Sequence, residues 1–168
     1  MFKLEKTQRW GKGNRSIKDR NVTNKFGPLA PSFFYPLVSA FMESRRNDSL
    51  WQGSNGAHLI SHVLTTLQNL VNNSGNYPGT EVLAKDMFEL TWAFRTAENS
   101  EVRIAVLNAL GVSLFYIQPQ NITQLSNVHE GEILEFLVNT ISNDSNETCR
   151  HLAMKISKIF QLISHQRF

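Results

Sequence analysis

The feature that most restricts the fold is the recurrence of apolar residues at helical intervals along nearly all of the chain beyond residue 29. The clearest stripe consists of Leu59, Ile60, Val63, Leu64, Leu67, Leu70 and Val71. Spacings of three and four residues place such side chains on one face of a helix. No stretch alternates between apolar and polar residues strictly enough to indicate a strand. The sequence therefore predicts an all-α fold.

Local signals place the ends of the expected helices. Pro31 suits the first turn of a helix that runs to Met42, and Pro36 is expected to bend it. Ser100 is expected to cap the helix at about 101–117, and Pro119 is expected to end it. A loop with Asn47, Asp48, Gly53 and Asn55 precedes the helix of the 59–71 stripe, which ends at residues 72–75, and further helices are expected at about 80–95, 101–117, 130–141 and 146–165.

The apolar pattern repeats at an offset of 47 residues. Seven apolar positions within 102–116 coincide with apolar positions within 149–163. Arg103 and Arg150 occupy the same place near the start of the second helix of each unit. This resembles the HEAT pattern, in which a polar cap, an apolar residue and an arginine begin the inner helix, and HEAT and armadillo units have periods of about 40 to 47 residues. We expect a short α-solenoid of HEAT-like antiparallel helix pairs, each burying its stripe against its neighbour.

Charge is distributed unevenly along the chain. Residues 1–25 carry eight basic and two acidic residues, whereas the remainder carries nine basic and twelve acidic ones. Because apolar residues are also sparse in the first segment, we expect a basic flexible tail or linker at 1–25 and an α-helical HEAT-like C-terminal domain at 26–168. Basic arms with interspersed aromatic residues also contact phosphates, so weak nucleic-acid binding is the alternative to a solvated linker.

Several protein classes are excluded by simple signals. No window approaches the ~20 apolar residues of a membrane span, and the N-terminus lacks the apolar core of a secretory signal, so we expect an intracellular protein without a membrane span. Cys149 is the only cysteine, which excludes an internal disulfide and a cysteine-based metal cluster. Its place in an apolar stripe favours a buried hydrophobic residue over a reactive thiolate.

Candidate catalytic and metal-binding residues are few. His58 and His62 have the i, i+4 spacing of a metal-binding pair, but no carboxylate lies between them, so exposed histidines are the favoured interpretation. The acids Glu130, Glu132 and Glu135 cluster where the positive end of a helix dipole stabilises them. Nucleophile-elbow, Walker and dinucleotide-binding motifs are all missing from the sequence. We therefore expect no enzyme, no cofactor and no metal site.

Three motifs in order resemble the telomere length regulation (Tel-type) protein family. The first is Asn24-Lys25-Phe26 followed by the segment 30–37, the second is 89–95 followed by Glu101-Val102-Arg103, and the third is 147–153. The resemblance covers roughly residues 24–166. We expect the motif residues to be structural, with Phe33, Phe34 and Leu37 packing the first helix; they are Asn24, Phe26, Phe33, Phe34, Pro36, Leu37, Cys149 and Arg150.

This resemblance implies a non-enzymatic scaffold and co-chaperone subunit that binds Tti-type partners and supports the maturation of phosphatidylinositol-3-kinase-related kinases. Those kinases act in telomere maintenance, the DNA-damage checkpoint and TOR-type nutrient signalling. The implied location is the cytoplasm and nucleus, telomeres included, and the chain would correspond to a C-terminal fragment of a longer protein or to a shortened gene product. The acidic linker through which that family recruits the heat-shock chaperone machinery has no counterpart in this sequence.

Surface positions on the helices are the expected partner contacts. Phe88 and Trp92 lie on the opposite side of their helix from the main stripe, which suits burial between layers better than an exposed docking pair. Trp92 and the neighbouring arginine can either support the fold or reach a partner. The candidate partner-binding residues are Arg45, Arg46, Lys85, Trp92, Arg95 and Arg103.

Overall fold

The computed structural model describes residues 26–125 and 128–165, and within them it contains six α-helices and no strand. The α-helices are α3 (Ala30–Ser44), α4 (Gly53–Ser74), α5 (Thr80–Trp92), α6 (Ser100–Tyr116), α7 (Glu130–Asn143) and α8 (Glu147–His165). Short 3-10 helices connect them: η2 (Gly27–Leu29), η3 (Asp48–Trp51) and η4 (Pro119–Gln124). The all-α prediction is confirmed. The predicted basic tail at 1–25 lies outside the described residues.

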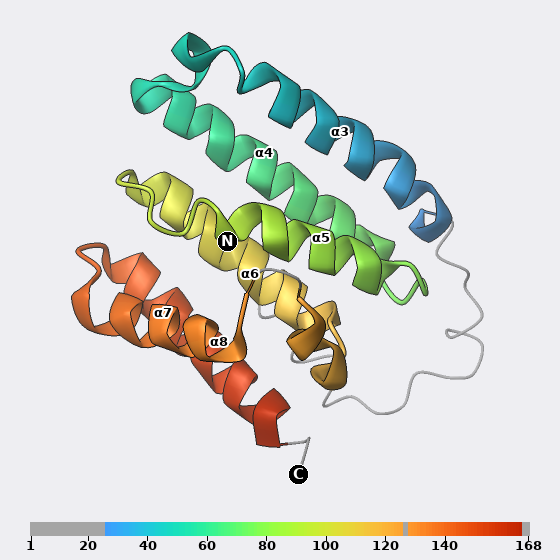
Figure 1. The fold of residues 1–168 in the computed structure, drawn as a ribbon, viewed down its shortest axis with the longest axis vertical. Helices are drawn as coiled ribbons and strands as arrows, with labels where there is room; N and C mark the ends of the chain where they lie inside the picture. Colours follow the sequence, from blue (N-terminus) through green and yellow to red (C-terminus); the bar gives the residue numbers. More distant parts are fainter. Residues whose placement is uncertain (1–25, 126–127, 166–168) are drawn as a thin grey trace.

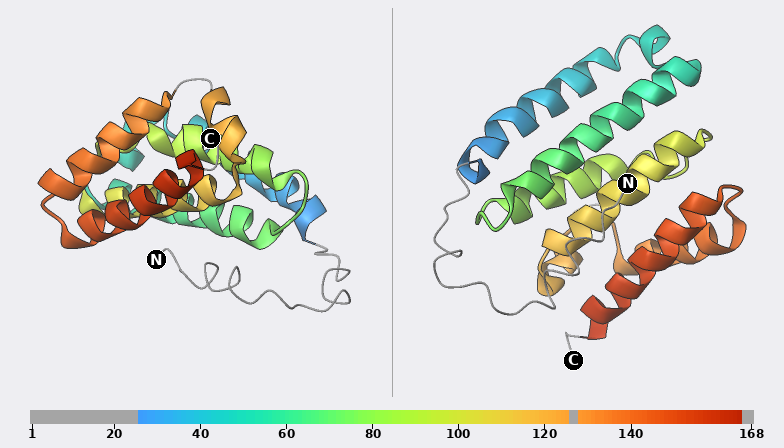
Figure 2. Two further views of the ribbon diagram at one scale, coloured as in Figure 1. Left: turned by 90° about the horizontal axis from the view of Figure 1, so that it is seen from below. Right: turned by 180° about the vertical axis from the view of Figure 1, so that it is seen from behind.

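The helices stack as three consecutive pairs, α3 with α4, α5 with α6, and α7 with α8 (Figure 1). Helices α4, α6 and α8 contact one another in succession and form one layer, which faces the viewer on the right of Figure 2. Helices α5 and α7 lie against the other side of this layer. This arrangement confirms the predicted short solenoid of helix pairs.

The core is centred on α6, which contacts α4, α5 and α8. Eleven residues of α6 between Val102 and Leu114 are buried. They include ten in a row from Ala105 to Leu114, so every side of the helix is covered there. A helix that is apolar on every side belongs in the interior of a stack. The single stripe expected at this helix is therefore only part of its buried surface.

The first helix confirms one aromatic prediction and corrects another. Phe34 is fully buried and Leu37 is half-buried, but Phe33 is 56% exposed and stacks on Phe26 with ring centroids 6.1 Å apart. The prediction that Phe33 packs into the core is wrong. Helix α3 ends the stack, so α4 covers only one side of it. Because consecutive helical residues point about 100° apart, Phe34 is buried while the adjacent Phe33 is exposed.

Two helix starts also differ from expectation. Helix α4 begins at Gly53, where a loop was predicted, with a φ of 68° that glycine adopts without strain. Its first turn packs so closely on η3 that a Cβ on Gly56 would lie 2.2 Å from the carbonyl of Trp51. The N-cap of α6 is Asn99, whose Oδ1 accepts a 2.8 Å hydrogen bond from Glu101 N, and not Ser100. Asparagine and serine cap equally well, so sequence alone did not distinguish the adjacent residues.

An ion pair joins the second and third helix pairs. Arg103 donates two hydrogen bonds of 2.9 Å, from Nε and Nη2, to the two carboxylate oxygens of Asp144 in the turn before α8. Both side chains are mostly buried, and the hydrogen bonds from Arg103 lower the pKa of Asp144. Arg150 donates to the carbonyl of Asp144 at 2.6 Å. The two arginines that the repeat aligns therefore meet at one residue.

The position of Cys149 agrees with the structural role predicted for this motif residue. Its side chain is fully buried, and burial raises the pKa of its thiol. Its backbone N–H donates a 3.1 Å hydrogen bond to Asn146 Oδ1 at the start of α8. The expectation of a small hydrophobic residue in the core is confirmed.

We predict that Phe34→Ala lowers the free energy of unfolding by about 3 to 5 kcal/mol, because it leaves a cavity where a fully buried ring was. Phe33→Ala is the matched control and should lower the free energy of unfolding by well under half as much, since the Phe33 ring is mostly exposed. Urea denaturation followed by circular dichroism measures both. Equal losses for the two variants would contradict the burial described.

We predict that Asp144→Ala lowers the free energy of unfolding by about 3 kcal/mol at pH 7, because it leaves Arg103 buried without its partner. Glu43→Ala removes only an exposed ion pair with Arg46 and should cost under about 0.5 kcal/mol.

The cost of Asp144→Ala should also depend on pH in a defined direction. Because the folded-state pKa of Asp144 is lowered, the stabilisation is fully present above its unfolded pKa of about 3.9 and is lost as pH falls further. The stability difference between wild type and variant should be constant from about pH 8 to 5 and shrink below about pH 4. A difference that grows on acidification would contradict the ion pair.

Candidate partner-binding groove

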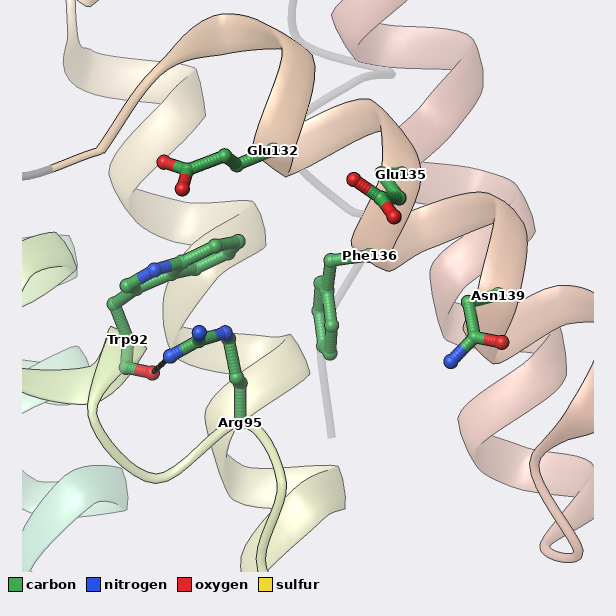
Figure 3. Close-up of a pocket in the computed structure, with 6 residues that line it drawn as sticks. All are labelled: Trp92, Arg95, Glu132, Glu135, Phe136 and Asn139. Carbon is green, nitrogen blue, oxygen red and sulfur yellow. Dashed lines mark hydrogen bonds between the residues drawn. The ribbon is translucent and has the colours of Figure 1, made fainter.

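An open groove lies between the end of α5 and the exposed side of α7 (Figure 3). Its volume is about 280 Å³, and its lining residues are Trp92, Arg95, Glu132, Glu135, Phe136 and Asn139. Helix α5 and the turn after it supply the first two, and α7 supplies the others. The groove therefore forms only where two successive helix pairs meet.

Aromatic rings form the base of the groove. Trp92 stacks on Phe88 with a centroid distance of 5.7 Å and makes a T-shaped contact with Phe136 at a centroid distance of 5.3 Å. Phe88 is fully buried and Trp92 is 8% exposed, so the prediction that this pair is buried between layers is confirmed. Phe136 is half-buried and joins α7 to the aromatic cluster. Such contacts add about 0.5 to 1.5 kcal/mol each beyond the area they bury.

Arg95 covers the outer face of Trp92. Its guanidinium carbon lies 4.6 Å from the ring centroid, and its Nη1 donates a 2.9 Å hydrogen bond to the Trp92 carbonyl. The side chain is half-buried. A cation in this position is attracted by the ring quadrupole and is held in place by the backbone bond. Arg95 is thus a fixed positive group at one wall.

Carboxylates line the opposite wall. Glu132 lies in the first turn of α7, where its Oε2 accepts a 2.9 Å hydrogen bond from His129 N. Glu135 lies one turn further along and is exposed. In Figure 3 both carboxylates face the aromatic rings across the groove. The groove thus offers apolar contact area together with groups of both charges, which suits a peptide side chain with an apolar stem and a cationic end.

The other predicted partner contacts lie elsewhere. Arg45 follows α3, is exposed, and lies 4.6 Å from the ring centroid of Phe94. Arg46 is highly exposed and lies 3.9 Å from Glu43. Lys85 is half-buried on α5. The structure brings only Trp92 and Arg95 of the predicted set together.

Arg103 has a structural position. Besides its two bonds to Asp144, its Nη1 donates a 2.9 Å hydrogen bond to the Ala97 carbonyl. These contacts raise the pKa of its guanidinium and use most of its donors. It joins the α5–α6 turn to the α7–α8 turn, so its substitution tests the fold.

Sequence reasoning missed the half of the groove that α7 contributes. Glu132 and Glu135 were attributed to helix electrostatics, and Phe136 was not singled out. The available signal was the position of Phe136, which lies off the main apolar stripe of its helix as Trp92 does. An aromatic residue outside the stripe indicates a second contact surface.

The two histidines on α4 are exposed, as predicted, but they are not isolated. A carboxylate that the local sequence lacks comes from Glu101 on α6, whose Oε1 lies 2.7 Å from Nδ1 of His58. Across residues 26–125 and 128–165, no group of three or more histidine, cysteine, aspartate and glutamate side chains is arranged to hold a metal ion.

The hydropathy of the helices also bears on the membrane prediction. None of the helices in the described part of the chain combines the length and apolar character that crossing a bilayer requires.

Comparison with known proteins identifies relatives among the telomere length regulation proteins. The chain is 28% identical over 160 residues to the mouse telomere length regulation protein TEL2 homolog, 24% over 162 residues to the human one and 23% over 152 residues to the Xenopus tropicalis one. These alignments cover 89%, 96% and 89% of this chain but only 18% to 19% of each relative. The resemblance to the telomere length regulation proteins is confirmed, and the chain spans under a fifth of their length. No family model and no solved structure matches it.

We predict that Arg95→Gln lowers the free energy of unfolding by about 0.5 to 1 kcal/mol, because it removes a cation from the face of Trp92. It should also increase acrylamide quenching of tryptophan fluorescence, since the long side chain shields the ring. Arg46→Gln is the control and should change neither quantity. Unchanged quenching in the Arg95 variant would contradict the stacked arrangement.

Proposed function

We propose that this chain, whose relatives are telomere length regulation proteins, is a non-enzymatic protein-binding module of such a protein. In this proposal it helps to hold Tti-type subunits and phosphatidylinositol-3-kinase-related kinases during kinase maturation, in the cytoplasm and nucleus. The observation that carries the proposal is the groove at Trp92, Arg95 and Phe136, which sits on a stack of helices and offers aromatic and charged contact area.

The chemistry of the groove favours a protein ligand. Its base is aromatic, and buried aromatic residues and arginine are the side chains that contribute most to protein interfaces. Glu132 and Glu135 supply negative charge opposite Arg95, so a partner segment is held in one orientation by charges of both signs. We propose that the occupant is a partner segment with a lysine or arginine whose stem lies on Phe136.

The scaffold architecture supports the same role. Helix pairs that stack in one direction keep separate surfaces at fixed distances, because each pair contacts only its neighbours. The ion pair between Arg103 and Asp144 fixes the third pair against the second, and with it the two walls of the groove. A rigid groove loses little conformational freedom when it binds.

The test is a charge reversal in the groove. Glu135→Arg should weaken recovery of the Tti-type partner or the kinase from cell extract by about tenfold or more, because an attractive contact becomes repulsive. Glu43→Arg is the matched control, since it reverses an exposed acid that does not line the groove and should bind as wild type does. Circular dichroism verifies that both variants are folded.

Two outcomes would count against the proposal. If the folded wild-type chain retains neither Tti-type subunits nor the large kinases, the partner assignment is wrong. If it retains them and Glu135→Arg does so equally well, the groove is not the contact surface.

The basic segment at 1–25 supports a second candidate function, nucleic-acid binding including telomeric DNA. Its eight basic and two acidic residues suit weak, salt-sensitive contact with phosphates. Removal of residues 1–25 should abolish retention of DNA or RNA at low salt, with groove-dependent protein binding unchanged. Equal retention by the shortened chain would refute this function.

A further inference from the structure

Two imidazoles converge on the exposed side of α4. His58 and His62 lie one helical turn apart, and their Nε2 atoms are 3.0 Å from each other. The ring centroids are 4.4 Å apart and the ring planes are nearly perpendicular, at 89°. The His58 side chain is 62% exposed, so the point between the nitrogens is accessible to solvent ions.

This spacing matches two ligands of one metal ion. Nitrogens at about 2.0 to 2.1 Å from a shared ion lie about 2.9 Å apart at a right angle and about 3.4 Å apart at the tetrahedral angle. The right-angled arrangement also places imidazole centroids about 4.5 Å apart, whereas a straight N–H···N hydrogen bond would separate them by about 5.3 Å. The observed distances therefore agree with adjacent positions in a square-planar or octahedral coordination sphere.

Glu101 completes the arrangement from a different helix. Its Oε1 accepts a hydrogen bond from Nδ1 of His58 at 2.7 Å, and the hydroxyl of Ser61 donates to the same oxygen at 3.0 Å. These bonds lower the pKa of Glu101, and the N-terminal end of α6 also favours its negative charge. With the proton on Nδ1, the lone pair of His58 lies on Nε2, the nitrogen that is 3.0 Å from Nε2 of His62. Carboxylates hold metal-binding histidines in this way.

We propose that His58 and His62 bind a divalent late transition metal ion of the Cu²⁺ or Ni²⁺ type through their Nε2 atoms, with Glu101 orienting His58 and water in the remaining positions. In the metal-free chain the two Nε2 atoms are in bent contact. Ion binding uses the lone pair on each Nε2, so a proton on Nε2 of His62 moves through solvent to Nδ1 of the same ring. Tetragonal nitrogen and oxygen coordination is typical of these ions, and Cu²⁺ binds most strongly in the divalent series.

The absence of a three-residue cluster in the described residues is consistent with this site. Glu101 lies on the far side of the His58 ring from the ion and acts on its ligand, not on the metal. Two protein ligands leave the coordination sphere open, unlike the four of a structural zinc site. The carboxylate that local sequence failed to provide is present because α4 and α6 are packed together.

The experiment titrates the full chain with Cu²⁺ and records electron paramagnetic resonance spectra and competition against a chelator. Wild type should show two equatorial imidazole nitrogens. His62→Gln should lose one nitrogen and bind at least about tenfold more weakly, and Glu101→Gln should keep both nitrogens with about 10- to 100-fold lower affinity. His151→Gln removes an exposed histidine on α8 and should behave as wild type.

Circular dichroism shows whether each variant keeps its helices, so loss of the fold is distinguished from loss of the ligand. A wild-type spectrum with one imidazole, or affinity unchanged by His62→Gln, would overturn the site. Affinity unchanged by Glu101→Gln would overturn the role of the carboxylate. A parallel titration with Zn²⁺ should give weaker binding than Cu²⁺ at the same two residues, and the reverse order would contradict the right-angled geometry.

Discussion

Burial of α6 on every side is the constraint on which the rest of this structure depends. A helix with apolar residues around its whole circumference is stable only when other helices surround it. Here α4, α5 and α8 surround α6. On their other sides, α4 contacts α3 and α8 contacts α7. The stack is therefore organised from its middle outward, and the outer helices α3 and α7 have one covered side and one free side.

Polar contacts then fix how the helix pairs are placed along the stack. Apolar packing is nondirectional, so it does not by itself determine the offset between α5–α6 and α7–α8. The two parallel hydrogen bonds between Arg103 and Asp144, together with the bond from Arg150 to the same residue, require one relative position. That position brings Phe136 and Trp92 into T-shaped contact and creates the groove.

The cations of this surface are held by their own neighbours to different degrees. Arg95 and Arg45 lie over aromatic rings, and Arg103 is paired with a buried carboxylate. Arg46, by contrast, is highly exposed and lies 3.9 Å from the exposed Glu43. Under the proposed binding function, recognition then depends on preformed surfaces, because the groups that define them are already oriented before a partner arrives.

The sequence by itself determined the helical class, the pairing of helices and the buried role of Cys149, because apolar periodicity and the 47-residue repeat are local properties of the chain. Its resemblance motifs also identified the relatives correctly. It did not determine that Phe33 is exposed while Phe34 is buried, because that outcome depends on which side of α3 is covered. It also did not determine that Asn99 caps α6, because asparagine and the adjacent serine cap equally well. Tertiary structure alone decided the groove and the Glu101–His58 contact, since both join residues about 40 positions apart whose meeting follows from helix packing.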